Sequence, residues 1–490
     1  MKNAKNVRLA LAALLILAAS VSASCGDSRT PAGSDGTQAV TGGATEAVTE
    51  EDPALMDNLP ERDYGGYEFK IYTRGCCAGG HKDGVWQLEE TGEGVDDAVF
   101  ERNKTVEERF NCVIREPEMA EGEDISVLTN SLMAGDAIAD LAIHHFRFLG
   151  DMALQQLCAD ANTLEYLDFS KPWWNSYLIQ NYSIFDKYFV INGTVNVDNI
   201  TEVSVILFNK TLTNNQLDVN FYDLVNEGKW TIDKMTEVVK SFGADLNGDT
   251  KIEYENDQLA LTANSGFMFQ FQVAMDQPTT KINSDGEPEL CINTEKMVNI
   301  VNKMYDMICA YEYSVVNDTV GSQAFLDGRA LFHVDKITSC VGASFREMED
   351  DYGIIPLPKY DEAQENYYSH ASAHADCLAI PVINEDFERA SIILEAMAAE
   401  GYKTIRPAVY DVAIKQKGAR DEDSAKMIDL IYAGRTGDFA DLYDEWGLVY
   451  TLDHMIGRQK INTFSSYYEK NESASIKRLA KAVDVFSSFE

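Results

Sequence analysis

Hydrophobic positions in the first part of the folded chain follow two different periods. YEFKIYT (67–73) alternates apolar and polar residues and runs into a glycine-rich loop, which predicts a strand. In DDAVFERNKTVEERF the apolar residues Val99, Val106 and Phe110 recur at helical spacing. CVIREPE predicts a second strand, DISVLTNSLMAG a helix that stops at Gly135, and ADLAIHHF a third strand. This order predicts a parallel sheet with helices on its faces.

The second half of the chain repeats this alternation of strands and helices. EVSVILFNKTLTNN predicts a long strand followed by a helix. GKWTIDKMTEVVKSF predicts a helix with Thr231 as N-cap, with Val238 and Phe242 on its inner face and Trp230 in the core. DQLALTANSGFMFQFQVAM predicts a strand that leads into an aromatic turn and a helix. SQAFLDGRALFHVDK and YGIIPLPKYDEAQENYYSHASAHADCLAIPVIN add further strands, and helices follow. The fold class is therefore α/β.

The N-terminal segment has the pattern of an export signal. MKNAKNVR is basic, and LALAALLILAASV is apolar but too short to span a bilayer comfortably. The small residues SAS precede Cys25, so residues 1–24 resemble a lipoprotein signal, in which this cysteine is lipidated and becomes the new N-terminus. Ser22 stands where an aliphatic residue is usual. A plain secretory signal cut near Ser24 is the alternative.

The segment that follows, residues 25–62, is rich in Gly, Ser, Thr, Ala and acids and has few large apolar residues. Such a composition cannot bury enough surface to order itself, so we expect a flexible tether. No later stretch is long and apolar enough for a membrane helix. We therefore expect the protein on the extracellular face of the cytoplasmic membrane, touching the membrane only through the lipid.

Composition excludes several classes of partner. The 490 residues contain 41 Lys plus Arg and 80 Asp plus Glu, a formal net charge of −39. Such a surface repels nucleic acid and anionic lipid. Of the nine cysteines none forms a Cys-x-x-Cys pair, so zinc and thioredoxin-like chemistry have no support. Cys76 and Cys77 are adjacent in a glycine-rich loop, and the pairing of the remaining cysteines stays open.

Six segments, in their order along the chain, resemble a known family. They are AGDAIADLAI, SVILFNKTL, GKWTIDKMTEVVK, FLDGRALFHVD, YGIIPLPKYD and HADCLAIPVIN. Together with the signal and the tether, they resemble the bacterial extracellular solute-binding proteins of type 1, the lipid-anchored cousins of maltose-binding protein that serve ABC importers. The resemblance covers residues 65–490.

The resemblance implies a two-lobe periplasmic-binding-protein-like fold, in which each lobe is a mostly parallel sheet flanked by helices. It implies a monomer that captures a sugar or oligosaccharide in the cleft between the lobes and passes it to importer permease subunits. No catalytic residue and no required cofactor is expected. Closure of the lobes requires hinges near 203–208 and 370–378. The expected lobes are 63–204 with about 375–450, and 205–374 with about 451–490.

Candidate ligand contacts come from two arguments. Ligands bind beyond the C-terminal ends of parallel strands, which selects the loops 74–86 and 144–147. Sugar sites pair flat aromatic rings with polar groups, which directs attention to the tryptophans and to the aromatic turn after LALTA; the resemblance places a sugar-stacking aromatic in that turn and another near Trp446. The predicted ligand-binding residues are Arg74, Trp86, His144, Trp174, Phe267, Phe269, Asp335 and Trp446.

Several of these residues could have a structural role, or none, in place of ligand binding. Trp86 and Trp446 could equally pack in the core, Asp335 could cap a turn, and Arg74 could be solvated. His144 and His145 are successive residues of a strand and point to opposite faces, which argues against a metal or catalytic pair.

The stretch ADLNGDTKIEYEND begins as calcium loops do, with oxygen-bearing side chains at alternate positions. Thr250 stands where glycine is preferred, and the usual closing glutamate is displaced. An Asx-rich turn without metal is the alternative. If calcium binds, it serves as a structural staple. The candidate ligands are Asp245, Asn247, Asp249, Lys251 and Asp257.

Two other functions compete with solute binding. A secreted two-carboxylate glycosidase would need a specific acid pair, and 80 acids guarantee chance pairs. Gly-x-Ser-x-Gly, His-Glu-x-x-His and phosphate-loop motifs are absent from the sequence. An adhesin or structural lipoprotein would be expected to contain repeats, and the sequence has none.

Overall fold

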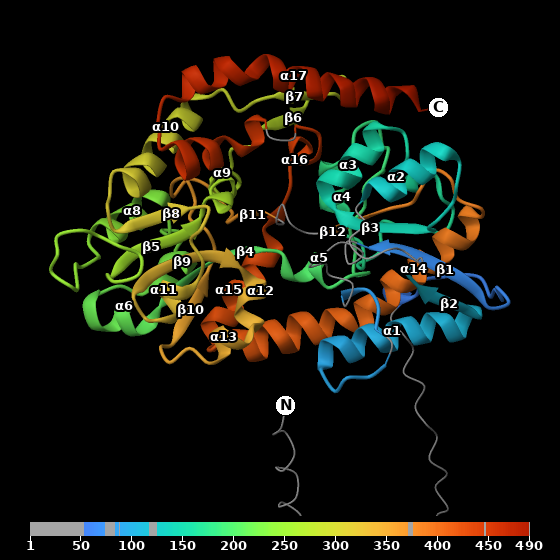
Figure 1. The fold of residues 1–490 in the computed structure, drawn as a ribbon, viewed down its shortest axis with the longest axis horizontal. Helices are drawn as coiled ribbons and strands as arrows, with labels where there is room; N and C mark the ends of the chain where they lie inside the picture. Colours follow the sequence, from blue (N-terminus) through green and yellow to red (C-terminus); the bar gives the residue numbers. More distant parts are fainter. Residues whose placement is uncertain are drawn as a thin grey trace, which may run out of the picture. The chain divides into compact units, whose positions relative to one another are not determined.

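Two sheets with helices on their faces organise the computed structural model of the chain (Figure 1). The structure describes residues 53–73, 84–87, 89–116, 125–370, 376–444 and 447–489. We call the part built on the four-stranded sheet the first lobe and the part built on the five-stranded sheet the second lobe. The predicted α/β class and two-lobe architecture are confirmed.

The first-lobe sheet has the strand order β12-β3-β1-β2. β1 (Tyr67–Thr73) lies between β2 (Cys112–Arg115) and β3 (Leu141–His145) and is parallel to both. β12 (Asp376–Ala379) is antiparallel to β3, with Asp376 opposite His145. The C-terminal ends of β1 and β3 therefore share one edge of the sheet with the start of β12.

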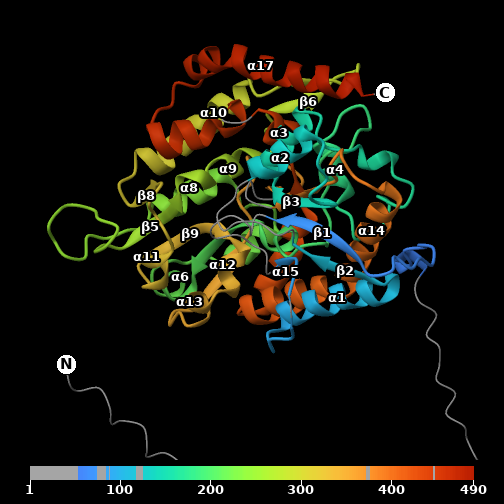
Figure 2. The ribbon, with the colours of Figure 1, turned by 45° about the vertical axis from the view of Figure 1, so that its right-hand side comes forward.

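The first-lobe helices pack on this sheet and on one another. α1 buries Val99, Val106 and Phe110, each 0% exposed, as their spacing predicts. α14 runs alongside α1, and α16 packs against α3 (Figure 1, Figure 2). The bounds are α1 (Gly94–Phe110), α2 (Ile125–Ala134), α3 (Phe146–Leu154), α4 (Ser176–Asn181), α14 (Phe387–Lys403) and α16 (Phe439–Tyr443).

The second-lobe sheet is mixed, with the order β10-β4-β9-β5-β8. β5 is parallel to β8 and β9, whereas β4 is antiparallel to β9 and β10. The bounds are β4 (Ser204–Asn209), β5 (Leu259–Asn264), β8 (Ser314–Asn317), β9 (Ala330–Lys336) and β10 (Tyr352–Ile355).

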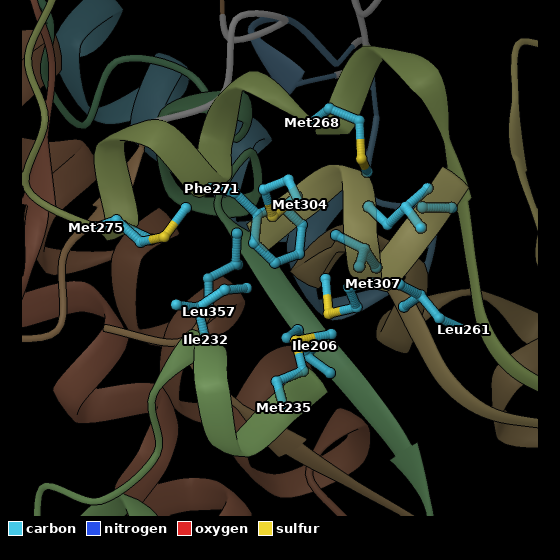
Figure 3. Close-up of a cluster of buried hydrophobic side chains, with 14 of the residues drawn as sticks. Ile206, Ile232, Met235, Leu261, Met268, Phe271, Met275, Met304, Met307 and Leu357 are labelled. Atoms are coloured by element: carbon cyan, nitrogen blue, oxygen red, sulfur yellow. The ribbon is translucent and has the colours of Figure 1, made fainter. Parts of the chain in front are cut away.

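The second-lobe core is an aliphatic and methionine-rich cluster (Figure 3). Trp230 is fully buried there, as predicted, and donates from Nε1 to the Pro356 carbonyl at 2.9 Å. Thr231 is the N-cap of α8 and accepts from Lys234 N, as the sequence predicts. The helices are α6 (Lys210–Gln216), α7 (Phe221–Asn226), α8 (Ile232–Lys240), α9 (Phe269–Ala274), α10 (Glu295–Met304), α11 (Gln323–Leu326), α12 (Ile337–Val341), α13 (Ala343–Arg346) and α15 (Glu422–Ala433).

Several segments pass between the lobes. α5 (Asp198–Thr201) leads into β4, and α14 continues into the π-helical η7 (Pro407–Gly418). β11 (Ser369–His370) pairs with β13 (Arg435–Thr436) just before the chain enters β12. Part of the predicted second hinge, residues 371–375, lies outside the described residues.

Two stretches differ from the expected lobe boundaries. The expectation placed residues up to about 450 in the first lobe, but α15 packs on β10 and η7 on α12, both in the second lobe. The C-terminal helix α17 (Phe464–Ser488) was expected in the second lobe, yet it contacts both. Its first part enters the second-lobe core at Tyr468, and its last part enters a first-lobe cluster at Phe486. Apolar residues at both ends of one 25-residue helix explain why it joins the lobes.

The remaining short elements surround this frame. β6 and β7 form a hairpin next to α16 and α17 (Figure 1). In the part of the chain that the structure describes, no helix is long and apolar enough to cross a membrane. The bounds are η1 (Pro53–Leu55), η4 (Ala161–Thr163), η5 (Ser265–Phe267), β6 (Thr280–Ile282), β7 (Pro288–Leu290), η6 (Tyr305–Cys309), η8 (Leu448–Tyr450) and η9 (Asp453–Gln459).

Candidate functional site

The residues that follow β3 in the first lobe meet the residues that follow β5 in the second lobe. The guanidinium of Arg147 lies 4.5 Å from the ring centroid of Tyr450. The ring of Phe269, in α9, lies edge-on to the Tyr450 ring, with 5.2 Å between the centroids. Because β3 and β5 end toward this point, we call it the strand-end junction and take it as the candidate ligand site.

Phe148 is the exposed aromatic side chain of the strand-end junction. It is 44% exposed, and its ring lies edge-on 5.1 Å from the ring of His144 and 5.8 Å from that of His145. An exposed flat ring bordered by imidazoles can stack on the apolar face of a sugar while neighbouring polar groups bind its hydroxyls. Phe148 is not among the predicted residues. The signal that could have identified it is its position three residues after His145, in the segment that follows the third strand.

Arg147 gives the strand-end junction a cationic group. Its Nε donates to the Tyr450 hydroxyl at 3.0 Å, and the side chain is half-buried. Tyr450 itself is buried, and burial raises the pKa of its hydroxyl well above the usual value. A neutral, hydrogen-bonded tyrosine therefore orients the guanidinium, whose planar set of donors suits hydroxyl or oxyanion acceptors.

A second set of buried groups holds the junction together. Phe269 is 1% exposed, its backbone N–H donates to Asp453 Oδ1 at 2.7 Å, and its ring lies 4.8 Å from that of His370. His370 Nε2 is 2.8 Å from Asp441 Oδ2. Burial raises the pKa of Asp453 to about 7. Phe269, predicted to contact the solute, is in this conformation a packing residue between the lobes.

The other two second-lobe candidates are Phe267 and Asp335. Phe267 lies in η5, directly after β5, and Asp335 lies near the end of β9. Phe267 is half-buried against the second-lobe core. Asp335 accepts from Lys336 N and from Ser339 Oγ of α12, both at 2.8 Å. Lys336 pairs with Glu202 at 2.5 Å. Asp335 and Lys336 thus place charged groups at the C-terminal end of β9. A ligand role for Asp335 stays a prediction.

The structure separates two predicted tryptophans from the strand-end junction. Trp174 is 4% exposed in the first-lobe core, and Trp173 and Trp174 donate to the two oxygens of Glu395 at 2.9 Å each. Burial raises the pKa of Glu395 to about 7. Trp86 is half-buried and donates to the Ile114 carbonyl at 3.1 Å. The Trp-Trp-Glu contact is the physical reason that Trp174 packs inward.

His144 is buried in β3, where its Nδ1 accepts from His145 N at 2.8 Å. It contacts the strand-end junction through the ring of Phe148. Arg74, Trp446, Cys25, Cys76 and Cys77 lie outside the described residues, so their predicted roles stay predictions. The six cysteines within the described ranges are free thiols: Cys112, Cys158, Cys291, Cys309, Cys340 and Cys377.

The predicted calcium loop folds around its own backbone amides. Asp245 accepts from Gly248 N at 2.6 Å and from Thr250 N at 2.8 Å, and Asp249 accepts from Lys251 N at 2.8 Å. Thr250 has φ +68°, the left-handed region that favours glycine. These are the bonds of an Asx-rich turn.

The closing acid of the loop, Asp257, also bonds to backbone amides of the loop. Asp257 is buried and accepts from Leu246 N at 2.9 Å and Glu253 N at 2.8 Å; these bonds to the Glu253 and Leu246 amides lower its pKa. Among the described residues, no group of three or more His, Cys, Asp or Glu side chains is placed to hold a metal ion. Calcium binding stays a prediction for this loop.

Comparison of the sequence with protein-family models and with curated proteins finds no match. Comparison of the structure with solved structures finds UgpB from Mycobacterium tuberculosis in complex with glycerophosphocholine, with a TM-score of 0.55 and 15% sequence identity. The similarity covers 86% of this chain and 98% of that one. At this identity the similarity establishes the shared two-lobe fold over nearly the whole of the other chain.

Proposed function

We propose that the chain is an exported solute-binding protein that captures a small solute, a sugar or oligosaccharide, between its two lobes. The observation that carries the proposal is the strand-end junction: Arg147 of the first lobe contacts Tyr450, Tyr450 packs against Phe269 of α9, and the residue after Arg147, Phe148, exposes its ring. The shared fold with UgpB, whose structure contains a small bound solute, supports it. Binding without turnover is proposed, because the buried acids near the junction are engaged in structural hydrogen bonds.

Each junction residue has a role in this proposal. Phe148 stacks on the solute, and Arg147 and His145 bind its polar groups. Closure of the lobes then covers the solute with groups from the end of β9, Asp335 and Lys336. Trp446 adds a second stacking surface, as the family resemblance implies.

Anchoring and delivery form the rest of the proposal. The lipid on Cys25 and the tether to residue 62 hold the monomer at the extracellular membrane face, where it delivers its solute to the permease subunits of an ABC importer. The signal-like residues 1–24 and the composition of the tether support this location. Replacement of Cys25 by Ser should abolish incorporation of labelled palmitate and release the protein from membranes; label retained by Cys25→Ser would contradict the anchoring.

Isothermal titration against a panel of glycans tests the binding function directly. We expect one saturable site per chain and no product when the same mixtures are assayed for hydrolysis. A phosphodiester such as glycerophosphocholine belongs in the panel as a separate arm, because UgpB binds it. Tight binding only in that arm would contradict the sugar class but keep solute binding. Turnover of a glycan without a stable complex would overturn the proposal in favour of a glycosidase.

A matched pair of variants locates the binding site. Phe148→Ala should weaken binding, and Phe185→Ala, the same truncation at a side chain that is 37% exposed elsewhere, should not. Equal effects of the two variants would place the solute away from the junction.

A further inference from the structure

A cavity of about 620 Å³ lies beside the segments that connect the lobes. Trp173 and Gly193 of the first lobe form part of its wall, and Tyr410 of η7 and Tyr432 of α15 form part of the wall from the second-lobe side. None of Arg147, Phe148, Phe269 and Tyr450 lines it, so among the described residues it is separate from the strand-end junction. This volume holds a small organic molecule.

The charged residues that line the cavity are mainly cationic. Lys171, Arg406 and Arg435 line it with one acid, Asp429. Asp429 is already neutralised, since it accepts from the Tyr410 hydroxyl at 2.6 Å and from Lys415 Nζ at 2.9 Å. A cationic lining contrasts with the composition of the whole chain, which has 80 acidic and 41 basic residues. Such a local reversal of sign attracts anions.

The two arginines have no carboxylate partner within ion-pair distance among the described residues. They rest on tyrosine rings instead: Arg406 lies 5.3 Å from the Tyr410 centroid, and Arg435 lies 5.0 Å from the Tyr432 centroid. Arg435 donates from Nη1 to the Asn199 carbonyl at 3.2 Å, while its Nε is buried without a partner. A half-buried cation without a counter-charge favours the binding of an anion that supplies the missing partner.

The arginines also influence each other. Burial lowers the pKa of Arg435, and the nearby positive charge of Arg406 lowers it further. Two neighbouring guanidiniums that are not ion-paired with a carboxylate are typical of sites that bind an oxyanion, because the planar donors of arginine match phosphate and carboxylate oxygens.

We propose that this cavity binds a small organic anion that carries a phosphate or carboxylate group, with Arg406 and Arg435 on the anionic group and the tyrosines and Trp173 around its body. Ser176 and Thr194 line the same cavity and can bind hydroxyls of the ligand. This site is additional to the solute site at the strand-end junction and does not depend on the proposed solute.

The test uses inorganic phosphate and citrate as probes, titrated calorimetrically into the full folded chain at constant ionic strength. We expect saturable binding of at least one probe. Arg406→Gln and Arg435→Gln should each weaken that binding at least tenfold, because each removes one of the two guanidiniums. Arg346→Gln, an identical change at an exposed arginine outside the cavity, should leave it unchanged.

Two further arms make the outcome decisive. If Arg435→Gln does not fold, Arg406→Gln and Lys171→Gln, both at half-buried side chains, carry the test. Phe148→Ala should retain probe binding while it loses solute binding, so failure of the two proposals can be distinguished. Absence of saturable binding of either probe, or binding lost in Phe148→Ala but kept in Arg406→Gln, would overturn the inference.

Discussion

Arg147 Nε donates to the Tyr450 hydroxyl at 3.0 Å, and the guanidinium lies over the tyrosine ring at 4.5 Å. The contact joins the residue that follows β3 to the end of η8, and the Tyr450 ring in turn packs against Phe269. A single tyrosine thus orients a first-lobe cation and contacts a second-lobe helix. If the solute binds here, the geometry of this pair must affect affinity.

Replacement of Tyr450 by Phe isolates the hydroxyl of this pair. The ring still packs against Phe269, but the hydrogen bond from Arg147 Nε to the Tyr450 hydroxyl is removed, so we expect a loss of about 1 kcal/mol of stability and weaker solute binding. Tyr311→Phe removes a comparable bond, from the Tyr311 hydroxyl to the Phe242 carbonyl at 2.8 Å, and should lower stability alone. Denaturant unfolding and calorimetric titration measure the two quantities. Unchanged affinity in Tyr450→Phe would mean that Arg147 does not contact the solute.

Truncation of Phe148 should separate binding from stability. Its ring is 44% exposed, so Phe148→Ala should melt within a few degrees of the wild type. Loss of a stacked ring should lower affinity by about 1 to 2 kcal/mol, roughly five- to thirtyfold. Phe146→Ala, at a neighbouring side chain that is 2% exposed, should instead lose about 3 to 5 kcal/mol of stability. A large fall in melting temperature for Phe148→Ala would show that the ring is a packing group.

Buried acids predict how stability changes with pH. Burial raises the pKa of Asp453 and of Glu395 to about 7, and that of Asp438 to about 6. In this range the folded state binds more protons than the unfolded state, so the free energy of unfolding falls as pH rises from about 5 to about 7. Each pKa unit corresponds to about 1.4 kcal/mol per group.

The variant Asp453→Asn tests this dependence. It keeps an oxygen acceptor for the Phe269 amide but removes the titrating group. Denaturant unfolding at pH 5, 6, 7 and 8 should therefore give a shallower decline in Asp453→Asn than in the wild type. Identical slopes in the two proteins would show that Asp453 is not a source of the decline.

Calcium binding has a direct thermal test. If Asp245, Asn247 and Asp249 ligate calcium, added calcium should raise the melting temperature relative to EDTA, because a ligand of the folded state stabilises it by mass action. Asp249→Ala should lose this rise, and magnesium should not replace calcium, because magnesium requires tighter octahedral geometry. Equal melting temperatures with calcium and with EDTA would leave the loop as an Asx-rich turn.

Local pattern explains which parts of the fold could be predicted. The face of α1 with Val99 and Phe110 and the cap at Thr231 depend on neighbours within a few residues, and both are observed. The parallel pairing of β1 with β3 also follows from the alternation of strands and helices along the chain. Contacts between distant segments leave no such local signal, which is why Tyr450 was not foreseen as the partner of Arg147.

The same limit explains the differences in the lobe boundaries and in Trp174. The sequence of α15 does not specify that the helix packs on β10, because an amphipathic helix can pack on either lobe. Trp174 lies in a loop with aromatic and polar neighbours, as ligand-contacting tryptophans do. Its inward position depends on Glu395, a buried acid from the distant helix α14.

The two tryptophans Trp174 and Trp446 should respond oppositely to substitution. Trp174 is buried and donates to Glu395 Oε2, so Trp174→Phe leaves a cavity and removes a donor from a buried carboxyl group. We expect it to lose about 2 kcal/mol of stability while the folded fraction binds solute normally. Trp446→Ala should do the reverse: a melting temperature within a few degrees of the wild type, and affinity lower by roughly five- to thirtyfold, as for a ring stacked on a sugar. Thermal unfolding and titration of the two variants side by side measure both effects. A large fall in the melting temperature of Trp446→Ala, with normal affinity in the folded fraction, would assign Trp446 to packing and leave Phe148 as the stacking residue.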